Sequence, residues 1–189
     1  MQTERNRRLN YSGRIELRPH ERADFPLYEE WYAATDIWNL SSWRAHPMKP
    51  AETRELFEGR QNSATDISFA IHLKESESST VVIGTIGLMN INDVASSGDL
   101  SIIIGRPEHR GSGYGPEAIA LMLDHGFEKA GLDKISLSVF DFNSAAIRTY
   151  RRLGFVYDGK IQNAVTREDG SHDAILMALT ADMWRRRRL

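Results

Sequence analysis

The segment IIIGRPEHRGSGYGPEA, residues Ile102 to Ala118, decides how the rest of the chain is interpreted. Ile102, Ile103 and Ile104 are β-branched and apolar on both faces, which is typical of a buried strand. Glycine then occupies positions 111, 113 and 115, and the apolar stripe that follows predicts a helix from about residue 113 to 130. The segment therefore predicts a strand, a glycine-rich loop and a helix in direct succession.

The loop from residue 110 to 115 has the chemistry of a pyrophosphate site. A helix N-terminus offers unpaired N–H groups and about half a positive charge, so it attracts anions. Backbone approaches a phosphate closely only where no side chain intrudes, which suits the glycines, and Arg110 adds a permanent cation. A P-loop needs a lysine followed by Ser or Thr, but Pro116 and Glu117 stand there. A dinucleotide-binding fingerprint belongs to a first βαβ unit, and this loop does not lie in such a unit. The remaining alternative is a glycine-rich tight turn that binds no ligand.

Upstream of this segment the sequence predicts a β-meander and two helices. Alternating or β-branched residues predict strands at 14–18, 67–73, 81–92 and 99–105. Helices are expected at 21–34 and from about 51 to 59, whereas residues 35–50 are expected to be irregular.

Downstream, the pattern predicts a strand, a short helix and a hairpin. The strand is expected at 135–139, and the helix is capped by Asn143 and ended by Gly154. The closing strands are expected at 155–161 and 173–179, joined through the turn signal Asp169-Gly170. This order predicts an α/β (α+β) fold, with a mixed, mostly antiparallel central sheet and helices on both faces.

Composition limits the classes of protein that fit. The chain has 189 residues, so we expect one domain over 14–184, a flexible lead-in over 1–13 and a basic C-terminal tail over 185–189. A net charge of −2 makes nucleic acid an unlikely partner, and the lack of cysteine excludes a disulfide framework, a thiolate metal site and a thiol nucleophile. Arg185 to Arg188 form either an anchor for RNA, phosphate or an acidic partner, or a solvated, frayed end.

Segments that would place the chain at a membrane or export it are not evident in the sequence. No stretch approaches the roughly 18 apolar residues of a membrane helix. The first nine residues are polar and lack the apolar run of a secretory signal. We therefore expect no membrane association and a cytoplasmic location.

Two segments of the sequence, residues 102–118 and 143–155, resemble the two motifs of one family. Residues 102–118 look like the coenzyme A motif of the GNAT superfamily of N-acetyltransferases, whose core is R/Q-x-x-G-x-G/A. Residues 143–155, NSAAIRTYRRLGF, look like its second motif, N-x-x-A/S-x-x-x-Y-x-x-x-G-F. Leu17-Arg18-Pro19, Gly159, Asp169-Gly170 and Asp173 are similar to the branch of ribosomal-protein N-terminal and polyamine acetyltransferases. The resemblance covers residues 14–180.

The resemblance implies acetyl-CoA as co-substrate, with no metal, and it implies which residues hold it. Ile103, Ile104 and Gly105 are expected to pair their backbone with the pantetheine arm, and Asn143 is expected near the pantetheine or the sulfur. The residues expected to hold the pyrophosphate are Arg110, Gly111, Ser112, Gly113, Tyr114 and Gly115.

Acetyl transfer to an amine needs an acid for the leaving thiolate and a route for the amine proton. Tyr150 is the candidate acid, because the resemblance places it by the sulfur and a phenol has a suitable pKa near 10; a buried core tyrosine is the alternative. Asp99 is the candidate base, acting through water. His109, His72 and bulk water are the other possible proton acceptors.

The resemblance implies that the acceptor binds near residues 25–50. Trp38 and Trp43 are the candidates for a cleft that binds an amine, with core packing as the alternative. The acceptor classes left open are a protein N-terminal α-amine and a small amine such as a polyamine or an aminoglycoside. A non-catalytic module that binds or senses acyl-CoA is the rival function, and both a monomer and a homodimer fit the sequence.

Overall fold

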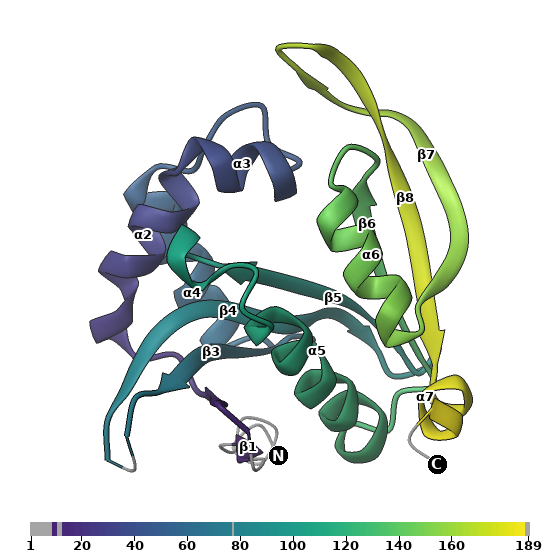
Figure 1. Cartoon of the computed structure of the whole chain (residues 1–189), viewed down its shortest axis with the longest axis horizontal. Helices are drawn as coiled ribbons and strands as arrows, with labels where there is room; N and C mark the ends of the chain where they lie inside the picture. The colour runs from purple at the N-terminus through teal and green to yellow at the C-terminus, as the bar shows by residue number, and fades with distance from the viewer. Residues whose placement is uncertain (1–8, 11–12, 77, 188–189) are drawn as a thin grey trace.

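An eight-stranded sheet organises the chain, in the order β1-β2-β3-β4-β5-β6-β8-β7 (Figure 1). The computed structural model describes residues 9–10, 13–76 and 78–187. The strands are β1 (Leu9–Asn10), β2 (Ile15–Arg18), β3 (Ile67–Lys74), β4 (Thr80–Asn92), β5 (Ser97–Ile104), β6 (Lys134–Phe140), β7 (Val156–Arg167) and β8 (Gly170–Thr180). Neighbouring strands run antiparallel except β5 and β6, which run parallel. The predicted mixed, mostly antiparallel sheet is confirmed.

The predicted meander and the predicted hairpin are both present. Strands β3, β4 and β5 pair in sequence, with Ile86 of β4 opposite Phe69 on one side and Ile102 on the other. Strands β7 and β8 pair up to Arg167 opposite Gly170, so the turn lies at the expected place. Both closing strands are longer than the sequence pattern indicates, because their polar outer halves pair with each other beyond the core.

The sheet splits between β5 and β6. The two strands pair only from Ser97 opposite Lys134 to Asp99 opposite Ser136. Beyond this register β5 continues along β4, while β6 continues along β8, and Figure 1 shows the two strands diverging. The split leaves one edge of each strand without a strand partner, and such edges bind other groups readily.

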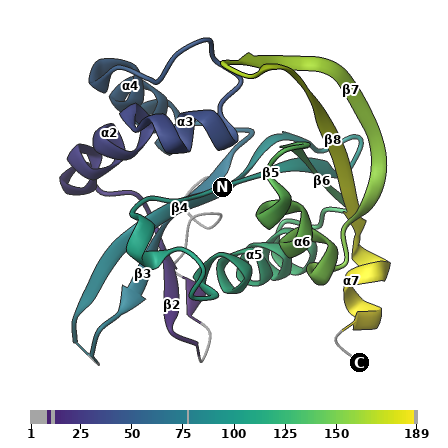
Figure 2. The same ribbon diagram turned by 45° about the horizontal axis from the view of Figure 1, so that its top comes forward.

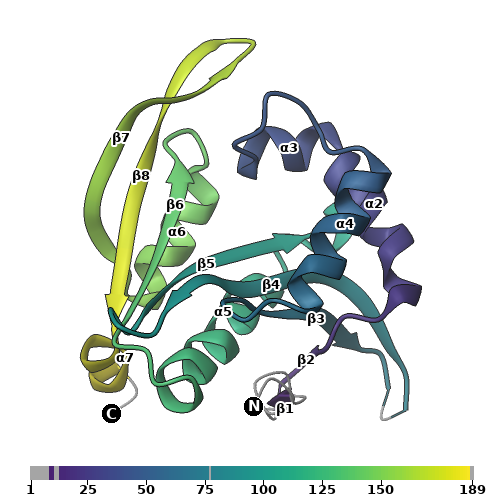
Figure 3. The same ribbon diagram turned by 180° about the vertical axis from the view of Figure 1, so that it is seen from behind.

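Helices cover both faces of the sheet (Figure 3). The helices on one face are α2 (Phe25–Ala33) and α4 (Pro50–Gln61), with α3 (Thr35–Ser41) following α2 towards the split. The helices on the other face are α5 (Tyr114–Asp124) and α6 (Ser144–Leu153). Short turns of helix, η1 (Arg22–Asp24) and η2 (Pro107–His109), precede α2 and α5, η3 (His125–Lys129) extends α5, and α7 (Ala181–Arg187) follows β8. Helices on both faces were expected.

The side-chain alternation of β5 assigns each face of the sheet its own core. Ile102 and Ile104 pack with the core that includes Ile119 of α5. Ile103, between them, packs with the core that includes Tyr28 of α2 and Phe57 of α4. Because successive residues of a strand point to opposite faces, residues 99, 101 and 103 face the α2 side.

The prediction that residues 35–50 are irregular is wrong over its first part. Ala34 adopts an extended conformation that ends α2, and a new helix, α3, begins at Thr35. A helix of seven residues has little stability of its own and depends on tertiary contacts. Its contacts, described below, come from residues far away in the sequence, so local pattern does not reveal it.

The C-terminal basic run begins inside a helix. Arg185 pairs with Glu128 at 3.7 Å, and Arg187 donates a hydrogen bond of 2.5 Å to the carbonyl of Arg152. Trp184 anchors the same helix, α7, against the core. Arg188 and the predicted lead-in, apart from residues 9, 10 and 13, lie outside the described residues. Of the helices the structure describes, none has the length and hydropathy of a membrane span.

Candidate active site

A large cavity lies where β5 and β6 separate. Its volume is about 1240 Å³, and Figure 2 shows α5 and α6 on one side of this region, with α3 and the β7–β8 hairpin on the other. The predicted site residues that line it are Asp99, Ile103, Ile104, Arg110, Gly111, Gly113, Gly115, Asn143, Tyr150 and Trp43. Those outside its lining are Gly105, Ser112, Tyr114 and Trp38. The split therefore brings most of the predicted donor site together with one predicted acceptor residue.

The glycine loop fits a phosphate-bearing ligand. Gly111 and Gly113 have φ values of 75° and 88°, in the left-handed region that glycine adopts without strain. Nothing lies within 4 Å of a Cβ built at Gly111, so there is open space beside it. Gly113 is the N-cap of α5, and no side chain of the described residues caps this end. The first-turn N–H groups are consequently available to an anion.

The end of β5 offers backbone groups to a ligand. After Asp99, β5 pairs with no described strand on the side of β6. The groups on that edge over Leu100–Ile104 are therefore available, except the Ile104 carbonyl, which accepts a hydrogen bond from Arg110. Gly105 is explained by packing, because a Cβ at this position would overlap the buried indole of Trp31. The strand end can therefore serve the pantetheine arm, while Gly105 itself keeps the strand against α2.

The guanidinium of Arg110 is already occupied in this structure. Its Nε donates to the carbonyl of Ile104 at 3.1 Å, and its Nη2 donates to the carbonyl of Gly105. Its Nη1 lies 2.5 Å from a carboxylate oxygen of Asp36, which holds the pKa of Asp36 below its ordinary value. Arg110 thus ties the glycine loop to the strand end and to α3, whereas the sequence predicts its charge beside the phosphates.

Asn143 caps helix α6 and also reaches the opposite wall. Its side-chain oxygen accepts a hydrogen bond of 3.2 Å from the N–H of Ala146, as an N-cap does. Its side-chain nitrogen donates to the carbonyl of Leu40 at 3.2 Å, which connects α6 to α3. The residue also lines the cavity.

Tyr150 lies on the part of α6 that borders the cavity. Its ring meets that of Phe155 edge to face, with centroids 5.8 Å apart. Burial raises the pKa of Tyr150 to about 12, because an apolar environment disfavours the phenolate. The hydroxyl is therefore protonated at neutral pH, as a general acid must be.

Asp99 approaches the split from the other face of the sheet. It is exposed at the last register at which β5 and β6 pair, and it accepts a hydrogen bond of 3.2 Å from the side chain of Asn90. By strand alternation it faces the α2 side, whereas Tyr150 comes from a helix on the opposite face. Of the other proton acceptors considered, His109 lines the cavity, while His72 is buried in β3 and outside the lining.

Residues 14–156 match the acetyltransferase (GNAT) domain family. The chain belongs to this family. It is 26% identical to spermidine N(1)-acetyltransferase of Escherichia coli K12 over 166 residues, which cover 87% of this chain and 85% of the relative. It is 28% identical to the spermidine N(1)-acetyltransferase of Vibrio cholerae over 151 residues, covering 79% and 83% of the two chains.

Solved structures show the same fold. A crystal structure of spermidine N-acetyltransferase from Vibrio cholerae with CoA and spermine superimposes with a TM-score of 0.82, at 24% identity, over 91% of this chain and 98% of the other. The predicted fold class, family and enzyme class are confirmed: this GNAT acetyltransferase transfers an acetyl group from acetyl-CoA to an amine. The acetyl donor is acetyl-CoA. The glycine loop and the open edge of β5 would hold this donor.

The two tryptophans predicted for the acceptor differ in their surroundings. Trp43 follows α3, is half exposed and lines the cavity, with its ring centroid 5.5 Å from that of Phe140 on β6. Trp38 lies outside the lining, and its indole N–H donates to the carbonyl of Arg44 at 2.9 Å. The guanidinium of Arg167 covers the Trp38 ring at 4.4 Å. Of the two, Trp43 alone lines this cavity, while Trp38 lies outside its lining and packs against Arg167.

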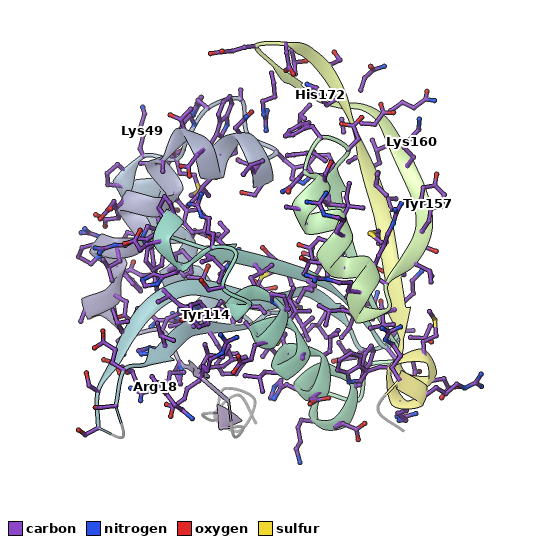
Figure 4. The ribbon with its side chains drawn as sticks, in the orientation of Figure 1. Arg18, Lys49, Tyr114, Tyr157, Lys160 and His172 are labelled. Atoms are coloured by element: carbon purple, nitrogen blue, oxygen red, sulfur yellow. The ribbon has the colours of Figure 1, made fainter. Side chains whose placement is uncertain are left out.

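Arg14 organises the glycine loop of this GNAT acetyltransferase, and no local signal points to it. Its guanidinium donates to the carbonyl of Ser112 at 2.9 Å, pairs with Glu117 at 3.2 Å and covers the ring of Tyr114 at 4.8 Å. Figure 4 shows Tyr114 at the start of α5. Ser112 and Tyr114, which lie outside the cavity lining, thus contact Arg14. These contacts join residues about a hundred positions apart in the sequence.

Proposed function

We propose that this enzyme acetylates a primary amine of a polyamine such as spermidine. Relatives that match over most of the chain include spermidine acetyltransferases of two bacteria. The structural observation that carries the proposal is the exposed carboxylate of Asp99 in the cavity, on the face bordered by α3. Asp158 supplies a second carboxylate to the lining, although Lys134 pairs with it at 2.7 Å. Trp43 adds an indole, whose face attracts ammonium groups.

In the proposed reaction the amine attacks the acetyl group directly. An alkylammonium in water has a pKa near 10.4, so the amine must lose a proton first, and Asp99 accepts it through water. The amine nitrogen then bonds to the acetyl carbon, and backbone N–H groups on the open edge of Leu100–Ile104 stabilise the oxyanion. As the carbon–sulfur bond breaks, the Tyr150 hydroxyl donates to the departing thiolate, and the second amine proton leaves to solvent.

A comparison of acceptors tests this proposal. Purified protein is given acetyl-CoA with spermidine, spermine, an aminoglycoside or a short peptide with a free α-amine, and thiol release is followed. We expect kcat/KM for the polyamines to exceed that for the peptide by about tenfold or more. A preference for the peptide would overturn the polyamine assignment. Coenzyme A binding without thiol release for any amine would instead favour the sensing module.

The contribution of Asp99 has a matched control. Asp99→Asn should raise KM for spermidine about fivefold to tenfold and lower kcat, while KM for acetyl-CoA stays similar. Asp93→Asn removes the same charge from the exposed turn before β5, outside the cavity lining, and should behave like wild type. Equal behaviour of the two variants would remove Asp99 from acceptor binding and from proton transfer.

A further inference from the structure

A buried arginine lies behind the cavity wall, beside the end of α3. Arg167 is the last residue of β7, immediately before the hairpin turn, and only 9% of it is exposed. Burial lowers its pKa, and no carboxylate of the described residues offsets the charge. A buried charge without a counter-ion is rare in proteins, because loss of hydration is costly. The neighbours of Arg167 must therefore supply other acceptors.

The acceptors are the carbonyl of Thr166, which receives Nη1 at 3.1 Å, and backbone carbonyls at the end of α3. The Nη2 group donates to Ser42 at 2.6 Å and to Trp38 at 3.4 Å, and Nε donates to Asn39 at 3.2 Å. The last carbonyls of a helix lack intrahelical partners and carry partial negative charge. The guanidinium of Arg167 is consequently a C-terminal cap for α3, supplied from a strand more than 120 residues away in sequence.

The same guanidinium is held between two aromatic rings. Its central carbon lies 4.4 Å from the ring centroid of Trp38 and 5.3 Å from that of Phe140. Phe140 is the last residue of β6, and its ring also contacts the exposed ring of Trp43 and the ring of Phe142. Arg167 thus joins three elements that border the cavity: α3, β6 and the β7–β8 hairpin. In Figure 2 the tip of this hairpin lies beside the chain that follows α3.

We propose that Arg167 is a positioning residue for the amine acceptor: it fixes the end of α3 and Trp43 against Phe140 and so sets the width of the acceptor end of the cavity. The proposal rests on the acceptor site assigned above. Ile37, Leu40 and Ser41 of α3 line the cavity directly, so movement of this helix changes the space for an amine. The glycine loop contacts the first turn of α3 through Arg110 and Asp36, not its last turn, and it has its own support from Arg14.

Geometry distinguishes arginine from lysine at this position. The guanidinium of arginine is planar, so it presents its N–H donors to the carbonyls in fixed directions and also stacks on aromatic rings. Lysine keeps the charge, but its single ammonium cannot bridge the same carbonyls and stack on both rings. Methionine keeps the apolar packing between the rings and removes every donor. Arg167→Lys and Arg167→Met therefore separate the charge from the fork.

The test compares these variants with Arg54→Met, which removes an exposed arginine paired with Glu29 between α2 and α4, outside the cavity. In Arg167→Met we expect KM for spermine to rise about tenfold, with KM for acetyl-CoA changed less than about twofold. Arg167→Lys should give an intermediate value. Hydrogen–deuterium exchange of residues 38–44 should become about tenfold faster in Arg167→Met. Arg54→Met should match wild type in each measurement.

Two results would overturn the proposal. One is an equal rise in KM for acetyl-CoA and for spermine, which indicates general loss of structure; circular dichroism of Arg167→Lys then shows whether the milder variant is folded. The other is hydrogen–deuterium exchange of residues 38–44 that stays at the wild-type rate in both Arg167→Met and Arg167→Lys. The exchange measurement does not depend on turnover, so it tests the role of Arg167 even if wild-type enzyme proves inactive towards polyamines and the proposed acceptor fails.

Discussion

Replacement of Tyr150 by phenylalanine removes one hydroxyl at the donor end of the cavity and keeps the ring that packs on Phe155. If the hydroxyl donates to the departing sulfur, the lost interaction is a hydrogen bond to a developing anion. Such bonds contribute about 1.5–3 kcal/mol. At 1.36 kcal/mol per factor of ten, kcat should fall about 10- to 150-fold, with KM for acetyl-CoA nearly unchanged.

The raised pKa limits what the hydroxyl does. A free thiol has a pKa of about 8.5, so complete transfer of a proton from a phenol at about 12 is uphill by roughly 5 kcal/mol. Tyr150 therefore acts mainly by hydrogen bonding while the carbon–sulfur bond breaks. The acid must be protonated to act, and this form is lost only as the pH rises through about 12. The profile of kcat should show no falling limb near pH 10 from this residue.

Steady-state kinetics with spermidine, from about pH 7 to 10, test both points. The matched control is Tyr157→Phe, since Tyr157 is 65% exposed on β7 and outside the cavity lining (Figure 4). An unchanged kcat in Tyr150→Phe would remove this residue from the mechanism. A falling limb near pH 10 that is present in wild type and absent in the variant would refute the raised pKa.

Three further outcomes follow from the structure. Gly113→Val should abolish coenzyme A binding in a calorimetric titration, whereas Gly131→Val, also at positive φ but outside the cavity lining, should bind normally. Trp184→Phe removes the 2.7 Å hydrogen bond to buried Asp124, so urea unfolding should show a loss of about 2 kcal/mol with kcat retained. The carboxylate of Asp169 raises the pKa of His172, so the protonated ring stabilises the folded state. This stabilisation is fully present below pH 6.5 and is lost as the pH rises through the raised pKa of the folded state. The urea midpoint should therefore fall less between about pH 6 and 8 in His172→Gln than in wild type.

The central part of the fold was predictable because its signals are local. Strand alternation over residues 67–73 and glycine at the end of the helix before Gly154 depend only on neighbouring residues, and the structure confirms both elements. The wrong prediction concerns Thr35–Ser41, a helix too short to form by propensity. Its ends are held by Arg110 and Arg167, which lie 74 and up to 129 positions away.

Some features of the candidate site were likewise predictable from local sequence, and others were not. The glycine loop was predictable because left-handed backbone and a helix N-terminus are properties of consecutive residues. The roles of Arg14 and Trp38 were not predictable, because each depends on a partner from another part of the chain. The sequence alone also does not reveal that Arg110 turns towards Asp36.

The amino-acid sequence by itself determined the family, the acetyl donor and the glycine-rich loop before α5, since each depends on contiguous residues whose backbone preferences act locally. Only the tertiary structure decided the shape of the acceptor end. There, the split between β5 and β6 opens the sheet, and Arg167 joins α3 to the β7–β8 hairpin. The physical reason is range: propensity and periodicity act over a few residues, whereas the acceptor walls are held by contacts between distant segments.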